Sequence, residues 1–288
     1  MEQQLTLFLA DLADKRQYSE NTIAAYRNDL NQLLKFLHDS KFPVVDAWAD
    51  VSAPIIEEYV ASLRARDYTS STIARKIAAM KSFFHYLNAQ HILSDDPTAG
   101  LDSPKVKKNP PRALAPEDIN RLLTATTRAT GPKALRDRAI LQLLYATGMR
   151  VTELVSLQLE DLDLGAGVVV CQSRAGRDRE MPLDAGAVVC LSEYLDSARP
   201  QLATEDSGNA LFLNHRGQQL TRQGLWLIIK AYAQEANLDV EVTPHTLRHS
   251  FAAHMLHNGA DLREVQKRLG HANLSTTQIY SQMVDEQP

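Results

Sequence analysis

The chain is poor in cysteine and contains no long apolar run. Only 2 of its 288 residues are cysteines, Cys171 and Cys190, which excludes the disulfide framework of a small secreted domain and suits a reducing compartment. No stretch approaches the roughly 18 consecutive apolar residues that a membrane-spanning helix needs. Glu2 stands in the region where a secretory signal peptide carries positive charge. We therefore expect a cytoplasmic protein without a membrane partner.

The composition also lacks the biases of unstructured chains. Apolar residues make up 44% and charged residues 23%, which is usual for folded proteins and excludes disorder or low complexity as a description of the whole chain. A length of 288 residues exceeds what one hydrophobic core usually serves. The sequence therefore predicts two folded domains.

Acidic residues are absent from one long segment, although they outnumber basic residues in the whole chain. The net charge is −4, yet residues 68–94 contain no Asp or Glu. Residues 64–112 hold nine Lys and Arg against four acids, and Arg75, Lys76 and Lys81 belong to this group. Such a local surplus of positive charge favours a phosphate-binding surface. The alternative is an ordinary solvated helix face.

Residues 102–113 form the predicted boundary between the two domains. The segment is rich in proline and has a single valine, so it cannot bury an apolar face. Its three lysines are Lys105, Lys107 and Lys108. We expect an extended basic linker between a domain of residues 1–101 and one of residues 114–288.

Apolar spacing predicts the elements of both domains. In the first, apolar residues recur at intervals of three and four, which predicts a helical bundle near residues 5–12, 23–37, 55–63 and 73–87. In the second, the short apolar runs 168–172 and 180–183 predict a β-hairpin among helices. The expected fold class is therefore mainly α with a small β-hairpin or sheet (α+β).

Four short stretches carry side chains that suit chemistry on a phosphate. They are Thr147-Gly-Met-Arg-Val-Thr-Glu-Leu154, His245-Thr-Leu-Arg-His249, Leu269-Gly-His271 and Ser275-Thr-Thr-Gln-Ile-Tyr280. His245 and Arg248 are three residues apart directly after Pro244, so they share a face on the first turn of a helix. The free N–H groups and the positive dipole of that turn, together with an imidazole and a guanidinium, suit a phosphate.

Each candidate also has a simpler explanation. Tyr280 adjoins an apolar stripe, so the alternative is a core or rim residue, and we expect it to be partly exposed. Arg150 and Glu153 have the spacing of a helical salt bridge. Five histidines suggest a metal site: His245, His249, His254, His257 and His271. However, Thr246 stands where the zincin pattern needs Glu, and no carboxylate or cysteine cluster accompanies them, so we predict no metal.

Taken together, the motifs resemble one family, the tyrosine site-specific recombinases (the phage integrase family), and within it the Xer group, most of all its XerD branch. The resemblance extends over nearly the whole chain. It includes Glu20-Asn-Thr-Ile-Ala-Ala-Tyr-Arg27, the basic linker, and the order Arg…His-x-x-Arg…Gly-His…Tyr. Its most specific part is Asn258-Gly-Ala-Asp-Leu-Arg263 followed by Leu269-Gly-His-Ala-Asn-Leu-Ser-Thr-Thr-Gln-Ile-Tyr280.

The resemblance implies an architecture and a set of partners. An N-terminal helical core-binding domain and a C-terminal catalytic domain would close around double-stranded DNA as a C-shaped clamp, with residues 68–94 and the linker lysines near phosphates. The family assembles on a specific recombination site as a homo- or hetero-tetramer with a related recombinase, and a septal DNA translocase is a further implied partner. No cofactor is implied.

The resemblance also implies roles for five matching residues. Tyr280 would attack a DNA phosphodiester, leaving a 3′-phosphotyrosine and a free 5′-hydroxyl without ATP or metal. Arg150 and Arg248 would bind the non-bridging oxygens. His245 would assist deprotonation of Tyr280 or hold the phosphate, and His271 would donate a hydrogen bond to it.

Two features depart from the family pattern. The family has a hairpin lysine, in a Gly-Lys-Gly setting, that protonates the leaving 5′-oxygen, but Arg174 occupies that position and no lysine occurs between Lys133 and Lys230. Arginine keeps the charge but barely releases a proton. The chain also ends eight residues after Tyr280, where Xer-like chains usually continue into a helix that docks on a neighbour, so we expect a shortened chain or different protomer contacts.

We therefore expect a site-specific recombinase that acts in chromosome or plasmid dimer resolution, and so in chromosome partition and cell division, or in mobile-element integration. One alternative is a type IB topoisomerase-like enzyme, which uses the same chemistry to relax supercoils. Another is a catalytically weak or structural DNA-binding member, which the arginine at position 174 favours.

Overall fold

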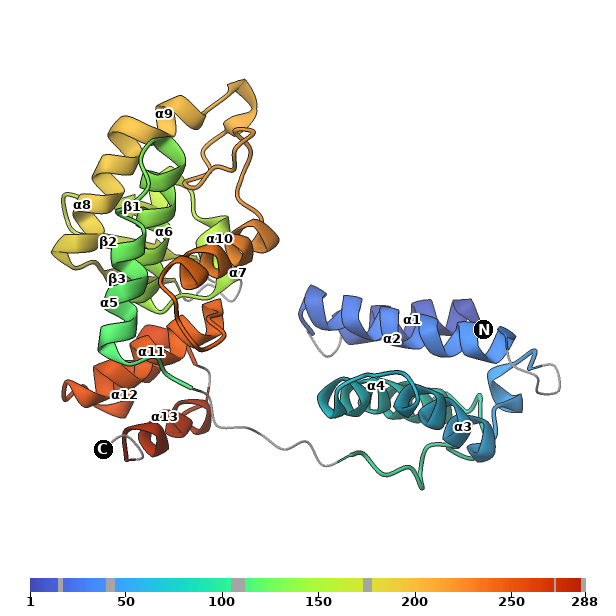
Figure 1. The fold of residues 1–288 in the computed structure, drawn as a ribbon. Helices are drawn as coiled ribbons and strands as arrows, with labels where there is room; N and C mark the ends of the chain where they lie inside the picture. Colours follow the sequence, from blue (N-terminus) through green and yellow to red (C-terminus); the bar gives the residue numbers. More distant parts are fainter. Residues whose placement is uncertain (15–17, 40–44, 105–111, 173–177, 272, 286–288) are drawn as a thin grey trace. The chain divides into compact units, whose positions relative to one another are not determined.

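Figure 1 shows the computed structural model of the chain, which describes residues 1–14, 18–39, 45–104, 112–172, 178–271 and 273–285. The chain divides into two units, Met1–Lys108 and Asn109–Pro288. The described residues are mostly helical, and their strands belong to one three-stranded sheet. The fold class expected from the sequence, mainly α with a small sheet, is confirmed.

The N-terminal unit contains the four helices that the apolar spacing predicts. They are α1 (Glu2–Asp14), α2 (Glu20–Asp39), α3 (Ala53–Arg64) and α4 (Ser70–Ala89), with a short 3-10 turn, η1, at Trp48–Asp50. Ser19 caps α2 by accepting a hydrogen bond from the Thr22 N–H at 3.2 Å, and Thr69 caps α4 by accepting one from the Thr72 N–H at 3.3 Å. Local sequence therefore sets where these helices start.

Aromatic rings fill the centre of this unit. Phe8 of α1 meets Phe83 of α4 edge-on at 5.2 Å between centroids, and Trp48 meets Phe83 at 4.7 Å. Helix α4 contacts α1, α2 and α3, so it is the helix around which the bundle is built. These four helices bury one apolar stripe each against that common core.

The second unit begins with three helices and the sheet. Its helices are α5 (Pro116–Ala125), α6 (Pro132–Thr147) and α7 (Val151–Ser156), followed by the 3-10 turn η2 (Leu159–Asp161). The strands β1 (Leu162–Asp163), β2 (Val168–Cys171) and β3 (Arg179–Pro182) pair antiparallel in the order β1-β2-β3. The predicted hairpin is confirmed as β2 and β3, with Val169 opposite Met181 and both side chains buried.

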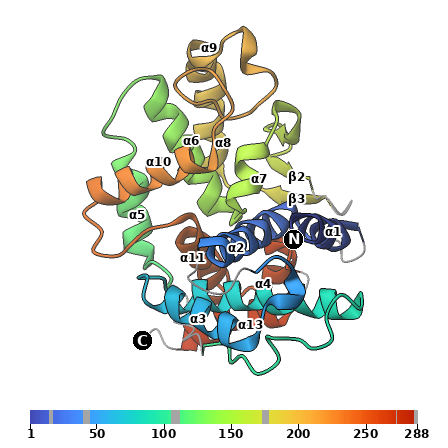
Figure 2. The same cartoon turned by 90° about the vertical axis from the view of Figure 1, so that its right-hand side faces the viewer.

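The rest of the unit is helical. It comprises α8 (Ala185–Glu193), the π-helical turn η3 (Tyr194–Ala198), α9 (Arg199–Leu202), the 3-10 turn η4 (Glu205–Ser207), α10 (Arg222–Glu235), α11 (Pro244–His257), α12 (Leu262–Leu269) and α13 (Ser275–Asp285). Helix α6 packs against α5, α8, α9 and α11, and Figure 2 shows it beside α8. Because most of its length is apolar and buried, α6 forms the centre of this unit.

Gly148 ends α6 and fixes how α6 meets α11. Its φ is +59°, in the left-handed region, and its N–H donates to the Leu144 carbonyl at 2.9 Å. A Cβ at this position would overlap the ring of Phe251 on α11. Glycine is therefore required by both the backbone and the close approach, which brings the α6 C-terminus onto the first turns of α11.

Helices α11, α12 and α13 pack together around a second, smaller apolar cluster. Its buried members are Phe251, Ala252, Val265, Leu269 and Tyr280. The three helices lie side by side in Figure 1, at the end of the unit below α10. This cluster positions the last of the predicted site residues.

Candidate active site and DNA-binding residues

Arg248 is the buried centre of the site. It lies on the first turns of α11 and is 6% exposed. Its Nη1 donates to the Gly148 carbonyl and its Nη2 to the Leu269 carbonyl, each at 2.6 Å. These carbonyls lie at the C-terminal ends of α6 and α12, where the helix dipole favours a cation. Two helix ends therefore hold the guanidinium in place.

This buried cation has no carboxylate partner among the residues that the structure describes. Burial, and next the charge of Arg150, lower the pKa of Arg248 to about 10, which still leaves the group charged at neutral pH. A buried charge without a counter-ion is unfavourable unless an anion is bound. Arg248 is thus placed to attract a negatively charged ligand, although the charge of Glu153 partly offsets its burial.

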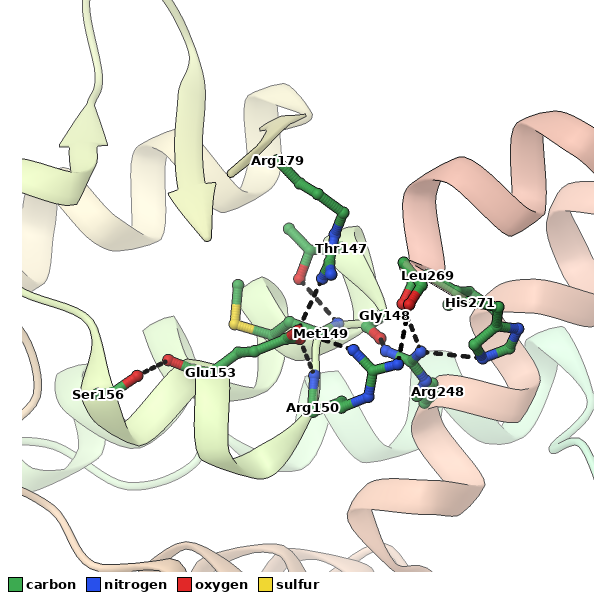
Figure 3. A network of polar contacts seen from close by, with 11 residues as sticks. Thr147, Gly148, Met149, Arg150, Glu153, Ser156, Arg179, Arg248, Leu269 and His271 are labelled. Carbon is green, nitrogen blue, oxygen red and sulfur yellow. Dashed lines mark hydrogen bonds and ion pairs between the residues drawn. The ribbon is translucent and has the colours of Figure 1, made fainter. Parts of the chain in front are cut away.

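Arg150 lies beside it at the start of α7 (Figure 3). Its Nη1 donates to Glu153 at 2.9 Å and its Nη2 to the Gly270 carbonyl at 3.1 Å, while its backbone N–H donates to Glu153 at 2.7 Å. The simple helical salt bridge with Glu153 is therefore present. Arg150 nevertheless also contacts the turn after α12, which lies next to Arg248.

Arg179, the first residue of β3, is a third guanidinium that sequence reasoning missed. Its Nη2 donates to Glu153 at 2.9 Å, so one carboxylate serves two arginines (Figure 3). Burial alone raises the pKa of Glu153, but the Arg150 backbone N–H and the two guanidinium groups outweigh it and leave this pKa below its ordinary value. The cluster therefore keeps a surplus of positive charge.

His271 follows Gly270 and contacts Arg248 directly. Arg248 Nη2 lies 3.1 Å from its Nε2, and Thr277 Oγ1 lies 2.9 Å from its Nδ1. Because the guanidinium can only donate, Nε2 accepts and Nδ1 carries the proton. Burial, followed by Arg248 and Arg150, lowers the pKa of His271 to about 4. In this arrangement its Nε2 does not donate, so the predicted hydrogen bond to a phosphate requires an exchange of partner.

Tyr280 is 1% exposed, so the expectation of partial exposure is wrong. Thr277 and Tyr280 share the face of α13 that packs against α11 and α12, whereas Ile279 of the apolar stripe is 37% exposed. The Tyr280 ring is parallel to that of His271, with centroids 6.3 Å apart. Burial raises the pKa of Tyr280 above its ordinary value, although Arg248 and Arg150 oppose this. Tyr280 is therefore a neutral phenol at neutral pH.

The hydroxyl of Tyr280 lies 2.9 Å from Nδ1 of His249. His245, one turn earlier on α11, is exposed and makes no hydrogen bond within the described part of the chain. The family pattern implied that His245 would assist deprotonation of Tyr280 or hold the phosphate. His249 was named only as one of five histidines that could suggest a metal site. The structure thus joins four of the six predicted catalytic residues, Arg150, Arg248, His271 and Tyr280, and adds His249.

The remaining predictions concern Arg174, the linker lysines, a metal site and a membrane span. Arg174 and the linker lysines 105, 107 and 108 lie outside the described residues. Within those residues no group of three or more His, Cys, Asp or Glu side chains is placed to hold a metal. The described helices also include none with the length and apolar character needed to cross a membrane.

The predicted phosphate-binding residues of α4 do not behave alike. Lys76 is buried, and its Nζ donates to Asp29 at 2.8 Å and to Gln32 at 2.6 Å. Arg75 also pairs with Asp29, although its side chain is 44% exposed. Asp29 of α2 therefore supplies a negative charge to the segment that has no acid of its own. Lys76 is a structural residue of the bundle, which corrects its assignment to the DNA-binding surface. Arg75 and Lys81 keep some exposure.

Comparison with known proteins shows the family of this chain. The phage integrase family matches residues 112–287, and the N-terminal SAM-like domain of phage integrases matches residues 5–91. A tyrosine recombinase XerC of Roseiflexus castenholzii is 50% identical over 99% of this chain and 90% of its own. A tyrosine recombinase XerD of Listeria monocytogenes is 43% identical over 95% of this chain and 92% of its own.

Solved structures of recombinases share the fold of this chain. The crystal structure of XerA recombinase is 29% identical with a TM-score of 0.55, covering 97% of this chain and 93% of that one. XerH bound to difH in a pre-cleavage complex has a TM-score of 0.73 at 24% identity, covering 96% of this chain and 82% of that one. Because identity to the XerC relative exceeds that to the XerD relative, the XerD branch stays a prediction. The chain belongs to the phage integrase family, as a tyrosine recombinase of the Xer type.

Proposed function

We propose that this site-specific recombinase binds a DNA phosphodiester between Arg248 and Arg150 and cuts it with Tyr280. The observation that carries the proposal is the buried Arg248 guanidinium, which has no carboxylate partner in the described structure and lies beside the Tyr280 phenol. A phosphodiester would supply the missing negative charge. Both arginines would bind its non-bridging oxygens, where charge grows in the transition state.

The reaction follows from the nucleophile. Attack by Tyr280 on the phosphorus would form a 3′-phosphotyrosyl bond and release the 5′-hydroxyl of the broken strand. The covalent bond conserves the energy of the original phosphodiester, so that rejoining to the same or another 5′-hydroxyl needs neither ATP nor a metal. This is strand transfer, the chemical step of recombination.

Two predicted catalytic residues keep supporting roles in the proposal. His245 is exposed on the first turn of α11, where a bound phosphate could accept a hydrogen bond from it. Arg174 would keep a positive charge near the leaving oxygen. Because arginine barely releases a proton, it is a poor general acid, so protonation of the 5′-oxygen would be the slow part of cleavage.

Double-stranded DNA is the proposed substrate. Relatives of similar fold were solved on DNA, such as XerH with difH and the Tn1549 transposon integrase with a circular intermediate. On this chain Arg75, Lys81 and the linker lysines are the proposed phosphate contacts outside the active site. The two domains, with boundaries at residues 101 and 114, would enclose the duplex as a C-shaped clamp.

We also propose an assembly and a cellular role from the names of the relatives. Because relatives are called XerC and XerD, a tetramer on DNA, either of this chain alone or with a related recombinase, is the proposed active form. Resolution of chromosome or plasmid dimers during cell division, in the cytoplasm and with a septal DNA translocase as partner, would be its task. Integration of a mobile element is the alternative.

Covalent trapping tests the chemistry. With a nicked suicide substrate, the parent protein should form a protein–DNA adduct, whereas Tyr280→Phe should bind the same DNA and form none. An adduct of undiminished yield in the variant would remove Tyr280 as nucleophile. The absence of any adduct with the parent would favour a DNA-binding protein, and supercoil relaxation without two cognate sites would favour a topoisomerase.

A further inference from the structure

The partner of the Tyr280 hydroxyl is not the histidine that the sequence pattern singles out. The hydroxyl lies 2.9 Å from Nδ1 of His249, and the two rings are tilted by 50° with centroids 5.4 Å apart. His245 lies on the first turn of the same helix, but it is exposed and has no such contact. Proton abstraction requires hydrogen-bond reach of the proton that is removed. His249 meets that condition.

We propose that His249 accepts the Tyr280 proton during cleavage and returns it during rejoining, an inference that rests on the function proposed above. As the bond between Tyr280 Oη and phosphorus forms, the phenolic proton moves to His249 Nδ1. The bond between phosphorus and O5′ breaks, and its electron pair goes to O5′, which takes a proton from water. In rejoining, the 5′-hydroxyl attacks phosphorus and returns its proton to water, the bond between Tyr280 Oη and phosphorus breaks, and the imidazolium of His249 protonates the departing tyrosinate.

The protonation state of His249 suits an acceptor. Burial, followed by the charges of His245 and Arg248, lowers the pKa of His249 to about 4, so the ring is neutral at neutral pH. The phenol of Tyr280 is also neutral, because burial raises its pKa. The hydroxyl is therefore the donor and Nδ1 the acceptor, so the single N–H proton of the neutral ring is on Nε2.

The same environment prevents the transfer before DNA is bound. Because the pKa of His249 is lowered to about 4 while burial raises that of Tyr280, proton transfer from the phenol to His249 is strongly disfavoured in the DNA-free protein. Burial is the largest cause of the low pKa of His249, and a phosphodiester would not remove it, but its negative charge beside Arg248 would offset that cation's contribution and so raise the pKa of His249. The other titratable groups close to His249 and Tyr280 in the described structure are His245 and His271, and neither is a carboxylate. The nucleophile would thus become reactive only with a phosphate in place.

A second histidine of α11 provides a matched control. His254 Nδ1 lies 2.9 Å from the hydroxyl of Tyr145, and its Nε2 lies 2.9 Å from the Leu114 carbonyl, which can only accept. His254 therefore has the same tautomer and the same histidine–tyrosine contact, half-buried on the same helix, outside the catalytic cluster. Loss of such a contact alone should affect both sites alike, whereas loss of a proton acceptor should affect only His249.

The variant His249→Asn separates hydrogen bonding from proton acceptance. An asparagine oxygen can accept from the Tyr280 hydroxyl near the place of Nδ1, but it does not take up the proton. With saturating nicked DNA in single turnover, we expect adduct formation to slow by about 10²–10⁴-fold, with DNA affinity within about twofold of the parent. His254→Asn should stay within a few-fold of the parent in both measurements.

Two further measurements identify the step that is lost. With sulfur in place of the bridging 5′-oxygen, the leaving group needs no proton, so a defect in proton acceptance should persist. In His249→Ala, added imidazole should restore adduct formation, and substituted imidazoles should restore it in order of their basicity. DNA binding by each variant reports that the protein is folded, and His249→Gln replaces the asparagine variant if that variant is insoluble.

The outcomes separate this inference from the function on which it rests. If the parent forms an adduct and His249→Asn forms it at the parental rate, His249 is not the acceptor, and a slow His245→Asn would transfer the role to His245. A His249→Asn defect that disappears with the sulfur substrate would also overturn the proposal. If the parent forms no adduct, or if Tyr280→Phe forms one, the proposed function itself fails.

Discussion

Replacement of Gly270 by alanine should destabilise the catalytic unit because Arg179 lies against this glycine. Gly270 has a φ of +62°, where an alanine costs roughly 1–2 kcal/mol. A Cβ here would also overlap the guanidinium of Arg179, so that side chain must move. Its hydrogen bond to Glu153, between side chains only 16% and 14% exposed, would then be lost.

The expected size of the effect follows from these two contributions. A hydrogen bond to a charged group contributes about 1.5–3 kcal/mol, which brings the total loss for Gly270→Ala to about 2.5–5 kcal/mol in the free energy of unfolding. Gly259→Ala is the matched control. Gly259 also has a positive φ, +89°, after a helix, but nothing lies within 4 Å of its Cβ position. It should lose roughly 1–2 kcal/mol, the backbone part alone.

Denaturant unfolding measures this difference. Trp48 lies in the N-terminal unit and Trp226 in the catalytic unit, so a Trp48→Phe background lets fluorescence report on the catalytic unit. In an Arg179→Ala background the overlap is gone, and Gly270→Ala should then cost only about as much as Gly259→Ala. Equal losses for Gly270→Ala and Gly259→Ala in the parent would refute the argument that Arg179 is displaced.

Three other expectations concern charge and proton transfer. Lys81→Ala should lower the slope of log affinity for DNA against log salt by about 0.9, whereas Lys76→Ala should mainly reduce the free energy of unfolding, because it leaves Asp29 buried with one partner fewer. Arg174→Lys should accelerate adduct formation by on the order of 10²–10⁴, and a gain that survives sulfur substitution at the 5′-oxygen would contradict the general-acid explanation. The pKa values of His249 and His271, each about 4, lie below the ordinary value of 6.5, so the unfolded chain binds more protons between these values and stability should fall as pH drops through this range. Urea midpoints across that range would test this, and a curve unchanged when both histidines are replaced would contradict it.

The sequence by itself determined the helices, the hairpin and the order of the motifs. Apolar residues at intervals of three and four, caps such as Ser19 and the turn glycine Gly148 act within a few residues, so their effect can be predicted locally. The motif spacing also sufficed for the family, which matches residues 112–287. Arg150, Arg248, His271 and Tyr280 were found from that spacing and converge in the structure.

Tertiary structure decided which side chains meet across the fold. Asp29 neutralises Lys76 from 47 residues away, so a count of charges along the segment could not identify it as a structural residue. Tyr280 is buried because α11 and α12 cover its face of α13, which an apolar stripe does not reveal. The contacts of Tyr280 with His249 and of Arg179 with Glu153 join different elements. Sequence periodicity specifies which face of a helix is apolar, but the partner on that face depends on long-range packing.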